Sequence, residues 1–266
     1  MKLKQIALIY CLLMPAVVFA LTADEIAQRV DARDDARDDG DKLISTMEMT
    51  LIDKNGNQRI RVMKNHSMDK KNATHNVIFF ISPANVRNTA FLTYDYDASK
   101  LDDDQWLYLS ALQKTKRIAS SDKSSSFMGS NFTYSDMTTR DISDYSYRIA
   151  KESKVRGHKV WIMESTPKTE KTIAETGYKK SYMFVRQDNF VVVRALHILQ
   201  EKGKKKYLDV KKLELIEGIW VATEIEMKTT QDKKLLHKTL LKLSDVKFNQ
   251  DLDDSFFTVR RIEKGL

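Results

Sequence analysis

The chain has 266 residues, of which 31% are charged and 42% hydrophobic, and its formal net charge at pH 7 is +8. These proportions are typical of a globular protein. A single cysteine excludes a framework of disulfide bonds. The positive excess is modest and spread over separate lysine groups such as residues 202–206 and 211–212, which favours solvated faces and suits an anionic lipid or an acidic protein as partner.

Residues 1–20 have the pattern of a secretory signal peptide. Lys2 and Lys4 form a positive start, an apolar run follows over residues 6–19, and Ala20 lies where signal peptidase requires small residues. The apolar run is too short for a membrane-spanning helix, which needs roughly 20 residues. We therefore interpret the segment as a signal that is removed from the mature protein.

Cleavage before Leu21 is expected, and a second cleavage frame follows Ala23. Cys11 falls inside the signal and follows Tyr10, where lipidation would need a small residue, so the mature chain has no thiol chemistry. We expect a soluble periplasmic protein with one domain over residues 21–266, and no nucleic-acid partner. Removal of the two signal lysines lowers its charge from +8 to +6.

The mature chain begins with a helical pattern and then changes to the pattern of strands. Residues 24–37 have helical spacing of small and apolar side chains, and Gly40 ends it. From residue 43 onward polar and apolar residues alternate. Short polar turns separate the segments, so neighbours are antiparallel, because parallel strands need long crossovers. The expected strand segments are 43–51, 60–62, 76–81, 89–94, 105–109, 115–118, 145–151, 159–165, 178–186, 190–199, 204–215, 219–228 and 235–243.

One connection, residues 119–141, is too long for a hairpin loop. Loops longer than about 12–15 residues are usually functional or disordered, and disordered loops rarely carry many large apolar side chains. This one is rich in serine, yet it contains Phe127, Met128, Phe132, Tyr134 and Met137. Two interpretations remain open: a lid whose apolar side chains occupy a cavity on the concave face of the sheet, or an ordinary loop that caps the core.

The polar segments show no recognisable catalytic or metal site. Residues 31–41 resemble a calcium-binding loop, but with Gly40 at the sixth position Arg37 falls where an oxygen ligand is needed. Residues 102–104 are typical of a polar turn. The five histidines are not paired as in zinc sites, and neither a phosphate loop nor a nucleophile elbow is present. We therefore expect no enzyme, no metal and no cofactor.

Apolar surface is the remaining candidate for function. Methionine is common on adaptable binding surfaces, although the same residues could simply fill a core. The candidate cavity and lid residues are Met47, Met49, Leu51, Trp106, Tyr108, Phe127, Met128, Phe132, Trp161, Met163, Ile225 and Met227.

Several segments resemble one known family. The longest match is formed by residues 104–109, 116–118 and 120–134, and residues 157–167 and 252–259 match as well. They resemble the bacterial outer membrane lipoprotein-sorting proteins related to LolA, and the resemblance covers nearly all of the mature chain. It implies a mainly β fold with short α segments, namely a LolA/LolB-like open half-barrel of about eleven antiparallel strands, with helices that close the concave face.

The resemblance also implies periplasmic binding of the acyl chains of a lipoprotein or lipid, with transient membrane contact. Members of this branch resemble companions of inner-membrane resistance-nodulation-division (MMPL-like) transporters. LolA holds its lid with an arginine, which residues 69–72 of this chain do not match. Two functions are therefore considered: a carrier that passes acyl chains toward the outer membrane, and an RseB-like sensor that holds a lipid or lipoprotein and regulates a membrane partner.

Overall fold

One antiparallel sheet dominates the structure. A computed structural model describes residues 20–38, 42–70, 72–97 and 101–266. Residues 1–19 of the expected signal peptide and the helix-ending Gly40 lie outside this described part. Within it, thirteen strands form a single sheet in the order β6-β5-β4-β3-β2-β1-β13-β12-β11-β10-β9-β8-β7. No helix in the described part is long and apolar enough to cross a membrane.

The strands follow the alternating segments of the sequence. In chain order they are β1 (Lys42–Asp53), β2 (Gln58–Lys70), β3 (Ala73–Ser82), β4 (Ala90–Tyr96), β5 (Asp104–Leu109), β6 (Lys114–Arg117), β7 (Tyr145–Val155), β8 (His158–Pro167), β9 (Tyr178–Arg186), β10 (Val192–Leu199), β11 (Lys204–Ile216), β12 (Ile219–Gln231) and β13 (Lys234–Lys247). Each expected segment overlaps one of them. The count of about eleven that the family resemblance implies is too low, whereas the thirteen alternating segments of the sequence correspond to the thirteen strands.

The first strand shows how side-chain alternation builds this sheet. Met49 and Leu51 are buried on one face, and Glu48, which precedes Met49, is exposed on the other. The strand ends in a turn in which the Asp53 carboxylate accepts the backbone N–H of Asn55 at 2.8 Å. Gly56 closes this turn with a φ of 87°, in the left-handed region that favours glycine. The local sequence thus sets both the buried face of β1 and the point where the chain reverses.

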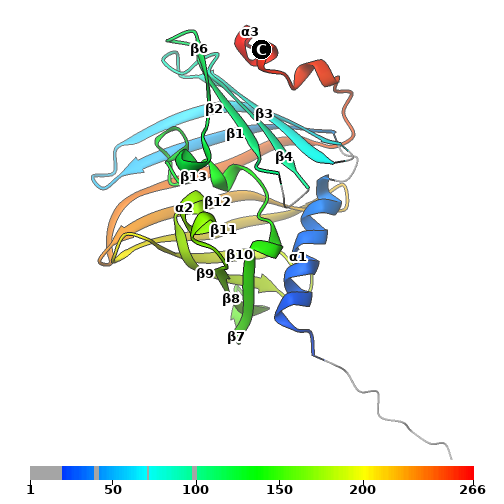
Figure 1. Cartoon of the computed structure of the whole chain (residues 1–266), viewed down its shortest axis with the longest axis vertical. Helices are drawn as coiled ribbons and strands as arrows, with labels where there is room; N and C mark the ends of the chain where they lie inside the picture. The colour runs from blue at the N-terminus through cyan, green and yellow to red at the C-terminus, as the bar shows by residue number, and fades with distance from the viewer. Residues whose placement is uncertain (1–19, 39–41, 71, 98–100) are drawn as a thin grey trace, which may run out of the picture.

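Pairing of β1 with β13 brings the first and last strands together in the middle of the sheet. As a result β6 and β7, which are consecutive in the chain, lie at opposite edges. The connection between them, residues 118–144, is called the crossover here. Figure 1 shows it in green, with the sheet curving around it. We call the face on which it lies the inner face. Its 3-10 turns are η1 (Ser120–Asp122), η2 (Phe127–Gly129), η3 (Ser135–Met137) and η4 (Ile142–Asp144).

Helix α1 (Ala23–Asp38) covers one end of the inner face. It begins with a capping box, in which the Thr22 hydroxyl accepts the N–H of Glu25 at 3.2 Å and the Glu25 carboxylate accepts the N–H of Thr22 at 2.7 Å. Ile26 is fully buried in a cluster with Met163 of β8. Cross-strand register places Met163 on the same face as Met227 of β12, which belongs to the same buried cluster as Phe127 of the crossover.

The other two helices lie on different faces. Helix α2 (Glu170–Thr176) contacts turns η1 and η3 of the crossover. Helix α3 (Val259–Lys264) instead packs on the outer face, against β4, β5 and β6. With the preceding turn η5 (Asp254–Phe256) it encloses an outer cluster in which Phe257 and Val77 are buried. Helices therefore cover both faces, and not the concave face alone as expected.

The C-terminal segment should contribute strongly to stability through Phe257, which is 1% exposed. Truncation in Phe257→Ala should lower the free energy of unfolding by about 3–5 kcal/mol, because it removes buried contacts and leaves a cavity. Denaturant unfolding followed by circular dichroism would measure the loss. Leu112→Ala is the matched control, since Leu112 is 63% exposed and should change stability little. Equal stability of wild type and Phe257→Ala would show that the outer cluster is not part of the cooperative core.

Candidate functional site

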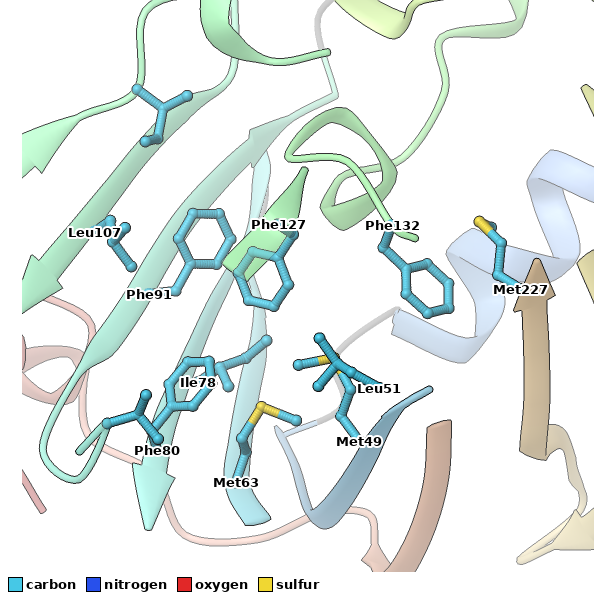
Figure 2. Packing of buried hydrophobic residues seen from close by; sticks show 12 residues of the cluster. Met49, Leu51, Met63, Ile78, Phe80, Phe91, Leu107, Phe127, Phe132 and Met227 are labelled. Atoms are coloured by element: carbon cyan, nitrogen blue, oxygen red, sulfur yellow. The ribbon is translucent and has the colours of Figure 1, made fainter. Parts of the chain in front are cut away.

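The middle of the crossover is a tight turn that presents two phenylalanines to the sheet. The Phe127 N–H donates to the Phe132 carbonyl at 2.8 Å, and Ser126 and Thr133 form an isolated bridge. Gly129, between the two phenylalanines, has a φ of 76°, which a residue without a Cβ adopts at little cost. Figure 2 shows both aromatic rings pointing toward the inner face.

These rings complete a buried inner cluster. The Phe127 ring centroid lies 5.1 Å from that of Phe91 and 5.7 Å from that of Tyr134. Burial of each large apolar side chain contributes roughly 1.5–3 kcal/mol, so the crossover is held mainly by contacts of this kind. The buried members of the inner cluster are Met49, Leu51, Met63, Ile78, Phe80, Val86, Phe91, Leu107, Ile118, Phe127, Phe132 and Met227, and Met47, Met128 and Ile225 pack against it partly buried.

A cavity of about 250 Å³ lies between the sheet and the crossover, beside this cluster. Most of its lining is apolar, with four polar residues among them. Of the residues proposed from the sequence, Met47 and Ile225 line it, whereas Met49, Leu51, Met227, Phe127 and Phe132 are packed in the adjoining cluster. The lining residues are Met47, Asn65, Asn76, Ile78, Phe91, Thr93, Asp136, Met137, Val221, Ala222, Ile225, Leu241 and Leu243.

Asn131 anchors the crossover to the centre of the sheet by buried hydrogen bonds. Its backbone N–H donates to the Thr239 hydroxyl at 3.0 Å, and that hydroxyl donates to Asn131 Oδ1 at 2.8 Å. Its Nδ2 donates to the Thr229 hydroxyl at 2.7 Å and to the His237 carbonyl at 3.2 Å. Buried polar groups are costly unless they are paired, so this network gives the crossover one defined position.

Asp136 makes a second anchor, toward β9 and β11. The Tyr178 hydroxyl contacts both carboxylate oxygens of Asp136, at 2.9 and 3.0 Å, and accepts from the Lys206 ammonium at 3.3 Å. Burial raises the pKa of the Tyr178 hydroxyl well above its usual value, and the Asp136 carboxylate raises it further. Burial also lowers the pKa of Lys206. Buried polar groups of β9 and β11 therefore adjoin the apolar part of the inner face.

An arginine also holds the crossover. A guanidinium nitrogen of Arg61 on β2 donates to the Met128 carbonyl. The sequence resemblance points to residues 69–72 for such an arginine, and not to Arg61. The pairing of β1 with β2 is what places this arginine. Arg61 is the cross-strand partner of Met49, so the two side chains share the inner face.

Comparison with known proteins agrees with this architecture. A domain described as an outer membrane lipoprotein-sorting protein, from Vibrio parahaemolyticus, superposes with a TM-score of 0.80 at 29% identity, covering 91% of this chain and 98% of the other. A DUF1329 family protein from Desulfovibrio piger gives 0.78 at 27% identity, covering 91% and 99%. A LolA superfamily protein from Nitrosomonas europaea gives 0.67 at 19% identity, covering 91% and 99%, which shows the shared fold alone.

A family model described as that of an uncharacterized protein matches residues 72–264. The chain belongs to the LolA-like family. No curated protein matches it. In this LolA-like chain the single sheet curves around the crossover, and the cavity lies between the two.

Four residues proposed from the sequence lie away from the cavity of this LolA-like chain. Trp106 and Tyr108 pack against the outer cluster, and the Trp106 ring lies 5.0 Å from that of Tyr94. Trp161 and Met163 lie beneath α1, where Trp161 stacks on Phe190 at 5.8 Å. The structure thus brings eight of the twelve candidates together around the crossover and separates the other four into two further clusters.

The acidic turn of the LolA-like chain is used in ion pairs. Asp102 accepts from the Lys171 ammonium at 2.8 Å, and Asp104 pairs with Arg117. Asp103 accepts the N–H of Tyr96 at 3.2 Å. Among the described residues, no group of three or more histidine, cysteine, aspartate or glutamate side chains could hold a metal ion. These contacts connect β5, β6 and α2 around the crossover.

His197, buried beneath the crossover, should make stability depend on pH. Its Nδ1 lies 2.8 Å from the Ser181 hydroxyl, its ring stacks on Tyr178 at 4.4 Å, and Arg140 and Lys206 are nearby charges. Burial, followed by Arg140, lowers the pKa of His197 from 6.5 to about 3. Between these values the unfolded chain binds a proton that the folded chain does not. Stability from this group is therefore complete above pH 6.5 and is lost as pH falls toward 3.

The His197→Gln variant should flatten this dependence by up to about 1.4 kcal/mol per pH unit. The free energy of unfolding of both proteins, measured in urea at pH 7, 6 and 5, gives the two slopes. His158→Gln is the control, because the His158 side chain is 50% exposed, and it should keep the wild-type slope. Identical slopes for wild type and His197→Gln would contradict the assignment.

Proposed function

We propose that the protein is a periplasmic carrier that binds the acyl chains of a lipoprotein or lipid on the inner face and passes them toward the outer membrane. The observation that carries this proposal is the largely apolar cavity beneath a crossover whose own apolar side chains cover the adjoining face. The Vibrio relative described as a lipoprotein-sorting domain supports the proposal by its similarity over nearly the whole chain.

The size of the cavity indicates how such a carrier would work. At about 250 Å³ it is smaller than the roughly 300–1,000 Å³ of common ligand pockets. A complete acyl chain therefore needs the space that Phe127, Phe132 and Met137 occupy. Each methylene group taken out of water contributes about 0.8 kcal/mol, so an acyl chain can replace the contacts that these side chains lose. The crossover is then a lid that exchanges places with the lipid.

The polar anchors imply that a partner assists opening. Withdrawal of the crossover would break the buried hydrogen bonds of Asn131 and the contact of Asp136 with Tyr178. A ligand shifts such an equilibrium only by its differential affinity for the open and closed states. An inner-membrane transporter of the resistance-nodulation-division class, suggested by the sequence resemblance, would supply the lipid and favour the open state during transient membrane contact.

A reversible lock tests the lid. The single cysteine of the sequence, Cys11, lies in the expected signal peptide. Asn131→Cys combined with Thr239→Cys therefore introduces one disulfide between two side chains that are hydrogen bonded in the wild type. The oxidised variant should transfer fluorescent phospholipid between vesicles at about one tenth of the rate of the reduced variant, or more slowly still, because the open state is no longer populated. Reduction should restore transfer in the same sample. Each single variant under oxidant is the control.

Equal transfer by the oxidised and reduced double variant would contradict the lid and favour a static loop. Retention of lipid without transfer in any state would instead favour the sensor function over the carrier.

The position of α1 supports processing before Leu21. Leu21 packs partly buried against the cluster beneath α1, and Thr22 caps that helix. Helix α1 and its cap therefore begin beside the expected cleavage site. Protein recovered from a periplasmic fraction should begin at Leu21 when its N-terminus is sequenced, and a start at Asp24 would indicate the second frame. Recovery of the chain with Met1 in the membrane fraction would contradict both the processing and the periplasmic location.

A further inference from the structure

The inner face carries a polar row that the apolar carrier function does not use. Ser45 and Asn65 are cross-strand partners on β1 and β2, and Thr93 on β4 is the partner of both Asn76 on β3 and Gln105 on β5. Ser45 lies two residues before Met47, and Asn65 lies two residues after Met63, so both share the face of the inner cluster. An apolar lipid chain gives these side chains nothing to bind.

Three members of the row are buried polar groups with an unmatched atom. Asn65 is 7% exposed, and Ser45 and Gln105 are 0% exposed. Within the described residues, Asn65 Oδ1, Ser45 Oγ and Gln105 Oε1 have no hydrogen-bond partner. Proteins pair nearly all buried polar atoms, so these unmatched atoms on β1, β2 and β5 indicate unmet hydrogen bonding on one face. Of the three residues Asn65 lines the cavity, where a bound group can complete its hydrogen bonding.

The row adjoins the cavity at one side. Asn65, Asn76, Thr93 and Asp136 line the cavity together with apolar residues such as Met47 and Ile225. A ligand that fits this lining has an apolar chain and a polar head. The chemistry of the head must match what the polar lining offers.

The polar lining suits a head group that donates hydrogen bonds and carries no negative charge. Asp136 contributes a carboxylate, which also accepts from Tyr178, and the unmatched atom in the lining is the Asn65 amide oxygen, an acceptor. Among the cavity-lining residues there is neither lysine nor arginine. A carboxylate or phosphate head would be desolvated beside Asp136 with no positive partner in the lining, which is strongly unfavourable.

We propose that the polar end of this cavity selects acyl chains whose head is an uncharged hydrogen-bond donor, such as a hydroxyl or an amide N–H, over chains that end in a carboxylate. This proposal rests on the carrier function proposed above and specifies its ligand. The hydroxyl of an acylglycerol and the amide of an N-acyl group share this chemistry.

Four ligands with the same oleyl chain test the proposal: oleamide, oleyl alcohol, methyl oleate and oleate. Calorimetric titration of the mature protein at pH 8 should give oleamide or oleyl alcohol a Kd about tenfold lower than methyl oleate, the effect of one or two neutral hydrogen bonds. Oleate should bind at least as weakly as the ester. A preference for oleamide over oleyl alcohol would identify the N-acyl group as the natural head, and the reverse preference the acylglycerol.

Two variants connect the preference to the polar row. Asn65→Leu and the isosteric Thr93→Val should each reduce the difference between donor and ester ligands to about threefold or less, because each removes one polar partner. Met47→Leu, an apolar exchange of similar volume in the same lining, should keep it. The melting temperature of each variant shows that the domain is folded, and Thr93→Val serves if Asn65→Leu does not fold.

The outcomes separate this inference from the carrier function. Equal Kd values for all four ligands, tightest binding of oleate, or an unchanged preference in both polar variants would overturn the head-group inference and leave lipid binding intact. If none of the four ligands binds, the carrier function itself is overturned along with it.

Discussion

The pairing of β1 with β13 is the constraint on which the rest of the structure depends. It joins the first and last strands in the middle of the sheet and thereby sends β6 and β7 to opposite edges. The chain between them must then cross the sheet from edge to edge, and in this protein it crosses on the concave side. In this protein the crossing segment has apolar side chains at the centre of its path, so the connection that topology requires is also the cover of the inner face. A hairpin at the same point would leave that face open to water.

The crossover is held by two kinds of contact with different consequences. Phe127 and Phe132 bury apolar surface, and such contacts are non-directional, so a lipid chain can take their place. Asn131 and Asp136 make directional hydrogen bonds that only one position of the crossover satisfies. The apolar contacts make the cover exchangeable, and the polar contacts give it a position to which it returns. A cover with apolar contacts alone would have many nearly equivalent positions.

Much of the fold could be predicted from the sequence, because the strands have a strong period of two and polar turns separate them. The same period shows that Trp106 and Leu107 face opposite sides of β5, but it cannot show which side is concave. Trp106 lies outside because the C-terminal segment, with Phe257, covers that face too. Both faces are therefore apolar, and apolar character does not distinguish them.

Other parts of the site depend on contacts between residues far apart in the chain. Asn131 contacts Thr239, 108 positions later, and nothing near either residue indicates the pair. Arg61 could be placed on the inner face only once its register with Met49 was known. The polar row was hidden for a different reason: Asn65 stands in a strand with Lys64 and His66, where a polar residue gives no sign of being buried. Long-range register, and not local pattern, determines these positions.

The energetic balance explains why a few polar groups can decide which lipid is bound. A buried acyl chain of about sixteen methylene groups contributes roughly 13 kcal/mol. Displacing Phe127, Phe132, Tyr134 and Met137 forfeits a comparable free energy at roughly 1.5–3 kcal/mol each, to which the hydrogen bonds of Asn131 add about 0.5–1.5 kcal/mol each. Because these large terms nearly cancel, the chain itself confers little selectivity. What remains is the pairing of the head group, so the polar row beside the cavity has an influence out of proportion to its size. The same cancellation keeps the lipid releasable, since a partner that supplies only a few kcal/mol can then reverse the exchange.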